Sequence, residues 1–393
     1  MTLKERIARR HRTTGDLRLV LESDALNPIA HPAEPTGREA VIEQLLDWLA
    51  PVFDGHCPGD CYVWGPKGAG KSAVVRPLFE QLRRLLGRNE THIYTTTRTA
   101  PDPNVQFVYV DARRAQSAFA LLHTVVDTVI TESIPRQGVG SDVIIERFAD
   151  HLAETNRQLV VAVDHVGEPE TISAEAAFEQ FDAFGDAVGC LAVGRTEPTD
   201  TVVSSRPDIE TVHVDAYTQY SLADVLTSRV ADGRLRTATT DEQLTALARW
   251  ADGDAHDALA ALFVATDRAA KRNGSTVTDD DIAHATATMP RPEVSLAQVL
   301  LLPPSRQQVL RALLDVPERD RSSVENTTAA IAADDTVDLS AGTLKRYLYE
   351  LADDGIVERV RTDGSTSGRP PSRIEPRFPT RVFRRLYDRE EPV

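Results

Sequence analysis

The residues with the clearest chemical meaning form a glycine-rich segment near residue 65. It reads Gly65-Pro66-Lys67-Gly68-Ala69-Gly70-Lys71-Ser72 and satisfies the pattern G-x-x-x-x-G-K-[ST]. Its glycines let the backbone fold round phosphates with N–H groups pointing inward, and the following helix N-terminus adds positive potential. Lys71 would reach the β and γ phosphates of ATP, and the Ser72 hydroxyl would ligate Mg²⁺. The segment therefore predicts a nucleotide site that runs from Gly65 to Ala73.

The alternative is a glycine-rich turn without a ligand, and the flanks of the segment decide against it. CysTyrValTrp at 61–64 predicts a strand before the loop. The residues after the loop predict a helix, because their apolar members share one face. These are Val74, Val75, Leu78, Phe79, Leu82, Leu85 and Leu86.

Besides Lys71 and Ser72, the site needs an acidic residue at the tip of a neighbouring strand, where its carboxylate can orient the ligands of the magnesium ion. Asp164 follows LeuValValAlaVal at 159–163 and fits this role. Hydrolysing enzymes of the wider class usually carry Glu at the next position, but this chain has His165, which we interpret as structural. Glu168 is the nearest acid downstream. The sequence thus predicts binding of ATP or ADP with Mg²⁺ and leaves hydrolysis open.

The elements around these residues indicate an α/β domain followed by helices. Between residues 36 and 215, apolar runs at 61–64, 105–110, 159–163 and 190–193 alternate with helical patterns, which predicts a parallel sheet covered by helices. From 217 to 288 the pattern is helical only, with segments near 218–231, 241–251, 254–272 and 278–288. Prolines at 290, 292, 303 and 304 place the last domain boundary near 292.

The C-terminal region has the element order of a winged helix-turn-helix. A helix begins after the N-cap Ser340 and ends at Gly355, with helices near 305–315 and 322–333 before it and a strand at 356–361 after it. In such domains the third helix enters the DNA major groove and the hairpin wing contacts an adjacent groove or the backbone. The expected DNA-binding side chains lie off the apolar face of that helix or beside the wing tip. They are Thr343, Lys345, Arg346, Tyr349, Arg369 and Arg373.

The charge of this region supports the same prediction. The whole chain carries 44 basic and 60 acidic residues, for a net charge of −16. Residues 340–389 nevertheless contain eleven basic and seven acidic residues, and clustered arginines are typical of surfaces that bind nucleic acids. The alternative for each arginine is a solvated or salt-bridged surface group. Lysine occurs only at positions 4, 67, 71, 271 and 345, and such acidic, lysine-poor usage resembles proteins of salt-loving archaea.

Composition also predicts the compartment. The 393 residues contain no 18-residue apolar run and no N-terminal signal pattern. We therefore expect a cytoplasmic, nucleoid-associated protein without a membrane partner. Cys57, Cys61 and Cys190 are too few for a disulfide framework and are interpreted as small buried residues.

At this point the chain resembles the AAA+ replication initiators of archaea, a family related to the eukaryotic origin recognition and cell-division-cycle initiators, and in particular its haloarchaeal members. The supporting motifs are LeuAsnPro at 26–28, ThrGlyArgGlu at 36–39, ProArgGlnGlyValGlySerAsp at 135–142, Tyr217 with the helix that ends in Leu226-Thr-Ser-Arg229, and GlyAspAla at 253–255.

The resemblance implies a fold of four parts. These are an N-terminal extension at 1–30, an AAA+ nucleotide-binding domain at 31–216, a helical lid at 217–291 and a winged helix at 292–393. It also implies that Tyr217, Arg229 and His256 lie near the nucleotide. The region 134–146 is a second candidate for DNA contact.

The chain departs from the family where the γ-phosphate is sensed or cleaved. The first sensor is usually Asn, and Arg195 stands in that region; the second is usually Arg, and His256-Asp257 follows the GlyAspAla motif. Arg206 is the candidate arginine finger, with a surface arginine as the alternative. These departures favour ATP binding with weak or absent hydrolysis.

The resulting hypothesis is a replication initiator that binds duplex DNA at an origin-like sequence, with ATP as a conformational switch. Its further partners would be a replicative helicase or its own copies on DNA. The alternative is an AAA+-derived transcriptional regulator or plasmid maintenance protein. A small-molecule kinase is a third class, and the predicted winged helix argues against it.

Overall fold

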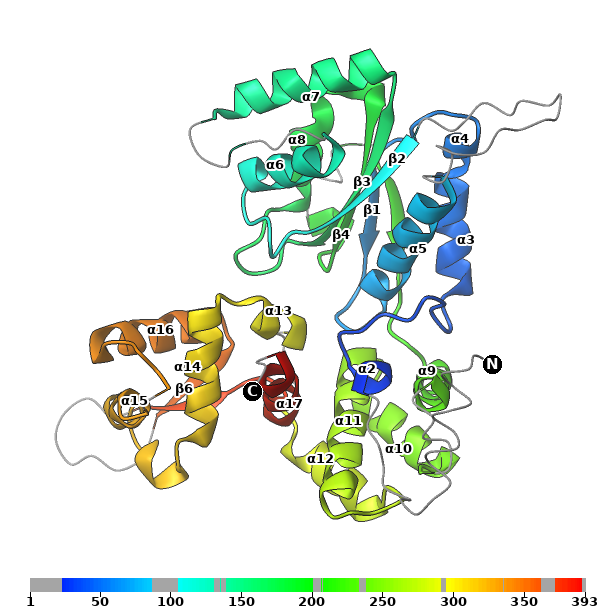
Figure 1. Cartoon of the computed structure of the whole chain (residues 1–393). Coiled ribbons are helices and arrows are strands. Elements are labelled where there is room, and N and C mark those ends of the chain that lie inside the picture. Colours follow the sequence, from blue (N-terminus) through cyan, green and yellow to red (C-terminus); the bar gives the residue numbers. More distant parts are fainter. Residues whose placement is uncertain are drawn as a thin grey trace, which may run out of the picture. The chain divides into compact units, whose positions relative to one another are not determined.

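The computed structural model describes two compact units (Figure 1). It covers residues 23–86, 105–130, 135, 139–200, 206, 208–232, 238–290, 295–334, 336–361 and 372–390. One unit, His31–Tyr217, is called here the sheet unit; the other, called the helical unit, joins residues 23–30 to the described residues from Thr218 onward. The chain thus divides between Tyr217 and Thr218, while the expected further boundary near 292 stays a prediction.

The sheet unit is built on a parallel sheet of five strands among the described residues. The strands are β1 (Cys61–Trp64), β2 (Val105–Asp111), β3 (Gln158–Val166), β4 (Val188–Gly194) and β5 (Glu210–His213). Their order is β2-β3-β4-β1-β5. Because the strands are parallel and only β4 lies between β3 and β1, the carboxyl ends of β1 and β3 lie at the same end of the sheet, one strand apart.

Helices cover both faces of this sheet, as Figure 1 shows. On one face lie α3 (Glu39–Trp48) and α5 (Lys71–Leu86), and on the other α6 (Ala118–Val129), α7 (Ser141–Thr155) and α8 (Ala174–Asp182). The short helix α4 (Ala50–Phe53) follows α3. Successive residues of β3 alternate between the two cores: Leu159, Val161 and Val163 enter one, and Val160 and Ala162 the other. Burial on both faces explains why β3 is a continuous apolar run.

The first part of the helical unit contains the helices expected for a lid. They are α9 (Gln219–Asp232), α10 (Asp241–Ala251), α11 (Ala255–Lys271) and α12 (Asp279–Thr288). Thr240 and Thr278 each form a capping box with the N3 side chain of the helix that follows. The short helix α2 (Ser23–Leu26) packs on α9 and α11.

The last part of the unit has the arrangement of a winged helix. After α13 (Leu296–Leu301) come α14 (Pro304–Asp315), α15 (Val324–Ala332) and α16 (Ala341–Asp353), then the antiparallel pair β6 (Val357–Arg361) and β7 (Ser372–Pro376), and finally α17 (Thr380–Glu390). Ser340 caps α16 by accepting a hydrogen bond from the Thr343 amide, and Gly355 follows the helix with a positive φ. Both predicted ends of this helix are confirmed.

Two strands and one residue of a predicted helix face were not predicted correctly. Strand β5 escaped notice because only Val212 of its four residues is buried, and β7 because it contains Ser372 and ends in Pro376. Leu85 was expected on the buried face of α5 but is 67% exposed. Of the cysteines, Cys61 and Cys190 are buried as expected, while Cys57 is half-buried.

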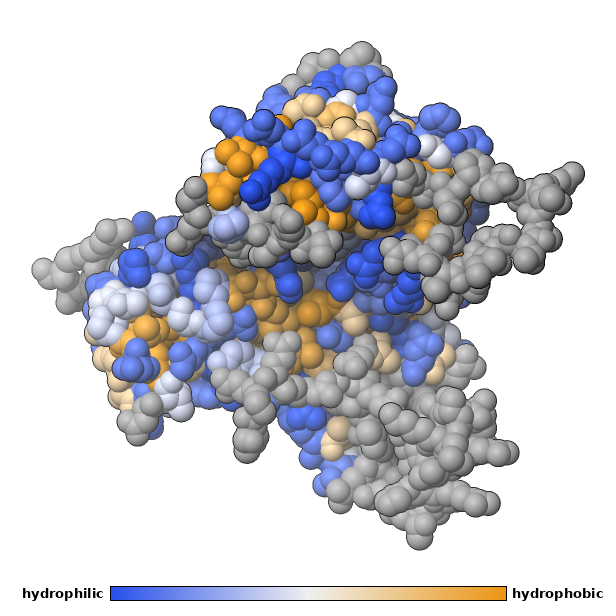
Figure 2. Space-filling model, turned by 45° about the horizontal axis from the view of Figure 1, so that its top comes forward, coloured by the Kyte–Doolittle hydropathy of each residue, from blue (hydrophilic) through white to orange (hydrophobic). Residues whose placement is uncertain are grey.

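The surface is largely hydrophilic on the face drawn in Figure 2. On the face shown in Figure 2, hydrophilic residues cover much of the coloured surface, and apolar residues gather in patches between them. In the part of the chain that the structure describes, no helix combines the length and apolar character that a membrane crossing requires.

A buried arginine fixes the N-terminal segment of the helical unit. The guanidinium of Arg229, 6% exposed, donates to the carbonyl oxygens of Asn27 at 2.9 Å and Ala30 at 2.6 Å. We expect Arg229→Ala to lower the free energy of unfolding by about 2 to 4 kcal/mol, since hydrogen bonds from a charged donor are lost. Denaturant titration measures this change. The exposed Arg249→Ala on α10 is the matched control and should change stability by less than about 0.5 kcal/mol; equal effects of the two substitutions would contradict the assignment.

Candidate functional site

The glycine-rich loop joins β1 to α5, as its sequence predicts. Gly65 has φ of 150° and Gly70 has φ of 83°, a region of backbone space that side chains disfavour. A Cβ at Gly65 would lie 2.1 Å from the Val214 carbonyl oxygen, and one at Gly70 would lie 2.6 Å from the Tyr217 hydroxyl. These two positions therefore require glycine for space as well as for conformation.

Lys71 and its neighbours occupy the start of α5. The Lys71 ammonium donates to the carbonyl oxygens of Gly65 at 2.7 Å and Pro66 at 2.8 Å. Its charge is thus held against the loop, where a phosphate would replace the carbonyls as the partner. Lys67, Gly68 and Ala69 complete the loop, and Ser72 and Ala73 belong to the first turn of the helix.

Asp164 lies near the carboxyl end of β3 and is 1% exposed. Its carboxylate accepts hydrogen bonds from the Tyr109 hydroxyl at 2.6 Å, from the His165 amide at 2.8 Å and from the Ser72 side chain. Burial is the largest influence and opposes ionisation, but the His165 charge and the hydrogen bonds from Tyr109 and Ser72 outweigh it and lower the pKa of Asp164. The two oxygen ligands expected to share a magnesium ion, Ser72 and Asp164, are therefore adjacent.

The segment after Asp164 brings His165, Glu168 and Arg195 together. His165 has φ of 67°, and the pairing of β3 with β4 shifts register between Asp164 and Val166. The Nδ1 atom of His165 lies 3.0 Å from Glu168 Oε1, and Arg195 Nη2 lies 2.6 Å from the same oxygen. Arg195, the first-sensor candidate, thus lies close to the segment that follows Asp164, where it forms an ion pair with Glu168.

Glu168 is a buried, ionised carboxylate that the sequence alone did not assign. Burial would raise its pKa, but the hydrogen bond with His165 and the charges of His165, Arg195 and Arg113 lower that pKa to about 2. Its second oxygen, Oε2, is buried and has no hydrogen-bond partner. Only its nearness to Asp164 in sequence pointed to this residue.

Arg38, near the start of the sheet unit, and Tyr217, its last residue, both contact the phosphate loop. Arg38 donates from Nε to the Ala69 carbonyl oxygen at 2.9 Å and from Nη2 to the Asp215 carbonyl oxygen at 2.8 Å. Its guanidinium carbon lies 3.6 Å from the centre of the Tyr217 ring. Tyr217 is thus beside the loop as expected, while Arg38 was known only as part of the motif at 36–39.

Three other predicted site residues do not lie beside the loop within the sheet unit. Arg206 belongs to that unit but lies elsewhere in it, and Arg229 and His256 belong to the helical unit. Arg206 pairs with Asp182 at 2.8 Å and with Asp60 at 3.5 Å. Because Asp60 precedes β1 and the loop follows it, Arg206 lies at the opposite end of the sheet. Arg229 and His256 belong to the helical unit, where His256 Nε2 accepts a hydrogen bond from the Leu296 amide at 3.3 Å.

His256 also belongs to a small cluster with Asp254 and Asp257 at the start of α11. One ligand-type atom of each residue lies within 4.8 Å of the others. Asp254 Oδ1, however, already caps the helix by accepting a hydrogen bond from the Asp257 amide. Asp254 therefore has a structural role as the N-cap of α11.

The candidate DNA surface is centred on α16. The Arg346 side chain is 63% exposed and forms an ion pair with Glu350 at 3.8 Å on the solvent side of the helix. Lys345 Nζ pairs with Glu325 of α15 at 2.7 Å, and the Thr343 hydroxyl shares a 2.9 Å hydrogen bond with Ser340 at the start of the helix. Binding of DNA by Lys345 would therefore require it to leave Glu325.

Strand β6 adds a residue that sequence reasoning counted but did not assign. The guanidinium carbon of Arg359 lies 4.7 Å from the centre of the Tyr349 ring, which places this exposed arginine beside α16. Arg373 on β7 forms an ion pair with Glu375. Arg369 lies outside the described residues, as do 134 and 136–138 of the second candidate region, whose remaining part leads into α7.

Comparisons with known proteins agree with this geometry. A family model described as an AAA ATPase domain matches residues 34–185. The chain is 27% identical over 259 residues to "ORC1-type DNA replication protein 9" of Halobacterium salinarum, covering 65% of this chain and 67% of that protein. It is 24% identical over 369 residues to "ORC1-type DNA replication protein 10" of the same organism, covering 88% of this chain and 86% of that protein.

The chain is therefore similar to the ORC1-type DNA replication proteins of archaea. Solved structures show the same fold. The Aeropyrum pernix ORC1 protein, solved in complex with DNA, has a TM-score of 0.60 at 19% identity and is covered over 96% of its length by 93% of this chain. The Aeropyrum pernix ORC2 protein, solved as ADPNP and ADP complexes, has a TM-score of 0.55 at 17% identity. The match covers 93% of this chain and 97% of that protein. The α/β AAA+ fold with a C-terminal winged helix is thus confirmed for this chain.

The low pKa of Glu168 generates a pH-dependent prediction. The carboxylate of the unfolded chain protonates near 4.5 and that of the folded chain near 2, so its stabilisation is fully present above pH 4.5 and is lost as the pH falls toward 2. We expect Glu168→Gln to lower the free energy of unfolding at pH 7 by about 3 kcal/mol and by progressively less below pH 4.5.

Denaturant titrations of both proteins between pH 7 and pH 3 provide the measurement. Glu154→Gln, on the exposed side of α7, is the control and should leave stability nearly unchanged. A deficit for Glu168→Gln that stays constant across this range would show that charge is not the cause.

Proposed function

We propose that this protein is a replication initiator that binds ATP in the sheet unit and duplex DNA through the winged helix. The observation that carries the proposal is the joint presence of two sites in one chain. Lys71, Ser72 and Asp164 meet at one end of the sheet, and α16 presents exposed basic side chains. The winged-helix order supports DNA as the second ligand.

The phosphate loop supplies the ATP contacts in this proposal. Lys71 would exchange the carbonyl oxygens of Gly65 and Pro66 for the β and γ phosphates, which carry more negative charge. Ser72 and Asp164 would hold Mg²⁺, which neutralises charge on the phosphates. Arg38 and Tyr217 fix the outer side of the loop. Arg229 and His256, which belong to the helical unit, are further proposed nucleotide contacts.

The segment from Asp164 to Arg195 supports binding in preference to rapid hydrolysis. Position 165 carries an imidazole, and the nearest carboxylate, Glu168, is engaged by His165 and Arg195. A catalytic carboxylate must instead reach the attacking water. We infer slow or absent turnover, with ATP acting as a conformational ligand.

DNA binding is assigned to α16 and the wing strand β6. Thr343 and Arg346 lie on the exposed side of α16 and would face base edges or phosphates in the major groove. Arg359, beside Tyr349, and Arg373 would contact the DNA backbone. The solved complex of the Aeropyrum pernix ORC1 protein with DNA supports this partner. A replicative helicase and further copies of this chain remain proposed partners on the DNA.

A regulator of transcription or plasmid maintenance is the second candidate. The altered sensors favour it, because Arg195 pairs with Glu168 and His256 bonds to the Leu296 amide. Chromatin immunoprecipitation with sequencing separates the two functions. Enrichment at replication origins is expected for the initiator, whereas enrichment confined to promoters would favour the regulator.

Two substitutions test the ATP site. Lys71→Ala should weaken ATP binding at least tenfold because the ammonium no longer meets the phosphates. Asp164→Asn, which keeps an acceptor oxygen for Tyr109 and Ser72 but removes the charge, should retain ATP binding in EDTA but lose the gain that Mg²⁺ gives the native protein. Isothermal titration calorimetry with and without Mg²⁺ measures both effects. Native affinity in Lys71→Ala would reject the assignment of the loop.

Charge removal on the winged helix tests the DNA surface. Arg359→Ala should weaken binding to all duplex sequences and reduce the slope of log K against log salt by about 1, as expected for one phosphate contact. Arg346→Ala should also reduce discrimination between sequences by roughly 1 to 3 kcal/mol if it reads a base. Fluorescence anisotropy over a range of salt concentrations measures both. Arg385→Ala on α17 is the control, and an equal effect there would contradict the proposed surface.

A further inference from the structure

Strand β2 is one edge of the parallel sheet and borders a cleft that shares Tyr109 with the surroundings of Asp164. Among the described residues it pairs only with β3, through residues 105–111. Alternate residues of a strand direct their N–H and C=O groups to opposite sides. Half of the backbone groups of β2 therefore point away from the sheet, where a further strand can pair with them.

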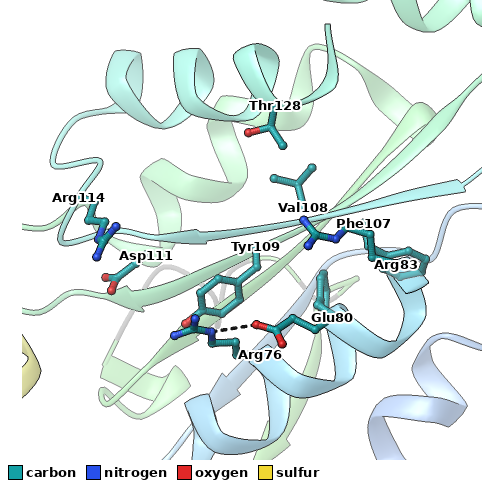
Figure 3. Close-up of a pocket in the computed structure, with 10 residues that line it drawn as sticks. Arg76, Glu80, Arg83, Phe107, Val108, Tyr109, Asp111, Arg114 and Thr128 are labelled. Atoms are coloured by element: carbon teal, nitrogen blue, oxygen red, sulfur yellow. Dashed lines mark hydrogen bonds and ion pairs between the residues drawn. The ribbon is translucent and has the colours of Figure 1, made fainter. Parts of the chain in front are cut away.

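The cleft runs along this edge between two helices, as Figure 3 shows. It encloses about 310 Å³ and is lined by β2 from Phe107 to Tyr109, by α5 and by Thr128 of α6. Phe107 and Tyr109 belong to one face of the sheet and Val108 to the other. Since residues from both faces line it, the cleft lies on the strand edge itself.

The charges in the cleft leave two arginines uncompensated. Arg76 pairs with Glu80 at 3.2 Å, and Asp111 is held by Arg113 at 2.7 Å. The remaining charged side chains, Arg83 and Arg114, are exposed and form no ion pair among the described residues. Two available cations beside an open strand edge are notable in a chain whose net charge is −16.

We propose that the β2 edge binds an extended acidic segment of a partner protein as an added strand. The backbone of the segment would pair with β2, as in other cases of β-strand addition. Its carboxylates would meet Arg83 of α5 and Arg114, which follows β2, while its apolar side chains would lie on the α6 side of the strand, beside Val108 and Thr128. A nucleic acid also carries negative charge, but it offers no strand backbone to pair with β2.

A synthetic peptide tests this proposal on the full chain. The probe is a fluorescein-labelled strand of roughly eight residues that alternates valine and glutamate, a length typical of β-strands. We expect it to bind, and we expect the same peptide with lysine in place of glutamate not to bind. A version with alternate backbone amides N-methylated should lose binding because it cannot donate hydrogen bonds to the edge. Fluorescence anisotropy measures all three.

Substitutions on α5 and after β2 locate the binding site. The double variant Arg83→Glu with Arg114→Glu should weaken the acidic peptide by about tenfold or more, with a larger effect at lower salt. Arg84→Glu is the matched control: Arg84 is 68% exposed on the same helix but does not line the cleft. Circular dichroism of each variant confirms that it is folded.

The remaining outcomes would overturn the proposal. It fails if no acidic peptide binds, if N-methylation has no effect, or if Arg84→Glu weakens binding as much as the double variant. Displacement of the bound peptide by duplex or single-stranded DNA would instead assign the cleft to nucleic acid. None of these measurements involves ATP, so the proposed function can fail independently.

Discussion

The structure of the candidate nucleotide site depends on one buried charge, the carboxylate of Asp164. A carboxylate that is 1% exposed is costly unless hydrogen bonds and opposite charge compensate for the loss of water. Ser72 reaches it from α5, Tyr109 from β2, and the His165 amide from β3, the strand that carries Asp164 itself. Each partner comes from a different part of the sheet unit, so the requirement to satisfy Asp164 fixes the phosphate loop, the edge strand and the segment after β3 relative to one another.

That segment also determines what the site can do with a nucleotide. His165 adopts a left-handed backbone conformation, and Glu168 binds both its imidazole and the Arg195 guanidinium. The groups that would cleave ATP are thus engaged in a buried network with a low carboxylate pKa. This arrangement supports the proposal that the chain binds ATP and turns it over slowly or not at all.

Sequence patterns predicted what depends on local spacing. The phosphate loop, the strand before Asp164 and the caps of α16 follow from residue types at fixed offsets, and the structure has them at the predicted positions. Spacing could not predict partners that are distant in sequence. Arg38 reaches Asp215, Arg195 reaches Glu168, and Arg359 reaches Tyr349 only because the sheet and the wing bring them together. Strand β5 was missed for a different reason, since one buried residue in four leaves no alternating pattern.

In the proposed function, ATP bound in the sheet unit controls DNA binding by the winged helix. The most direct measurement is the affinity of the full chain for an origin duplex, with and without ATP, in the native protein and in Lys71→Ala. The claim predicts a change of roughly 5- to 150-fold in the native protein, matched by an equal change in ATP affinity when DNA is added, and no change in the variant. A native protein that binds the duplex equally well with and without saturating ATP would contradict it.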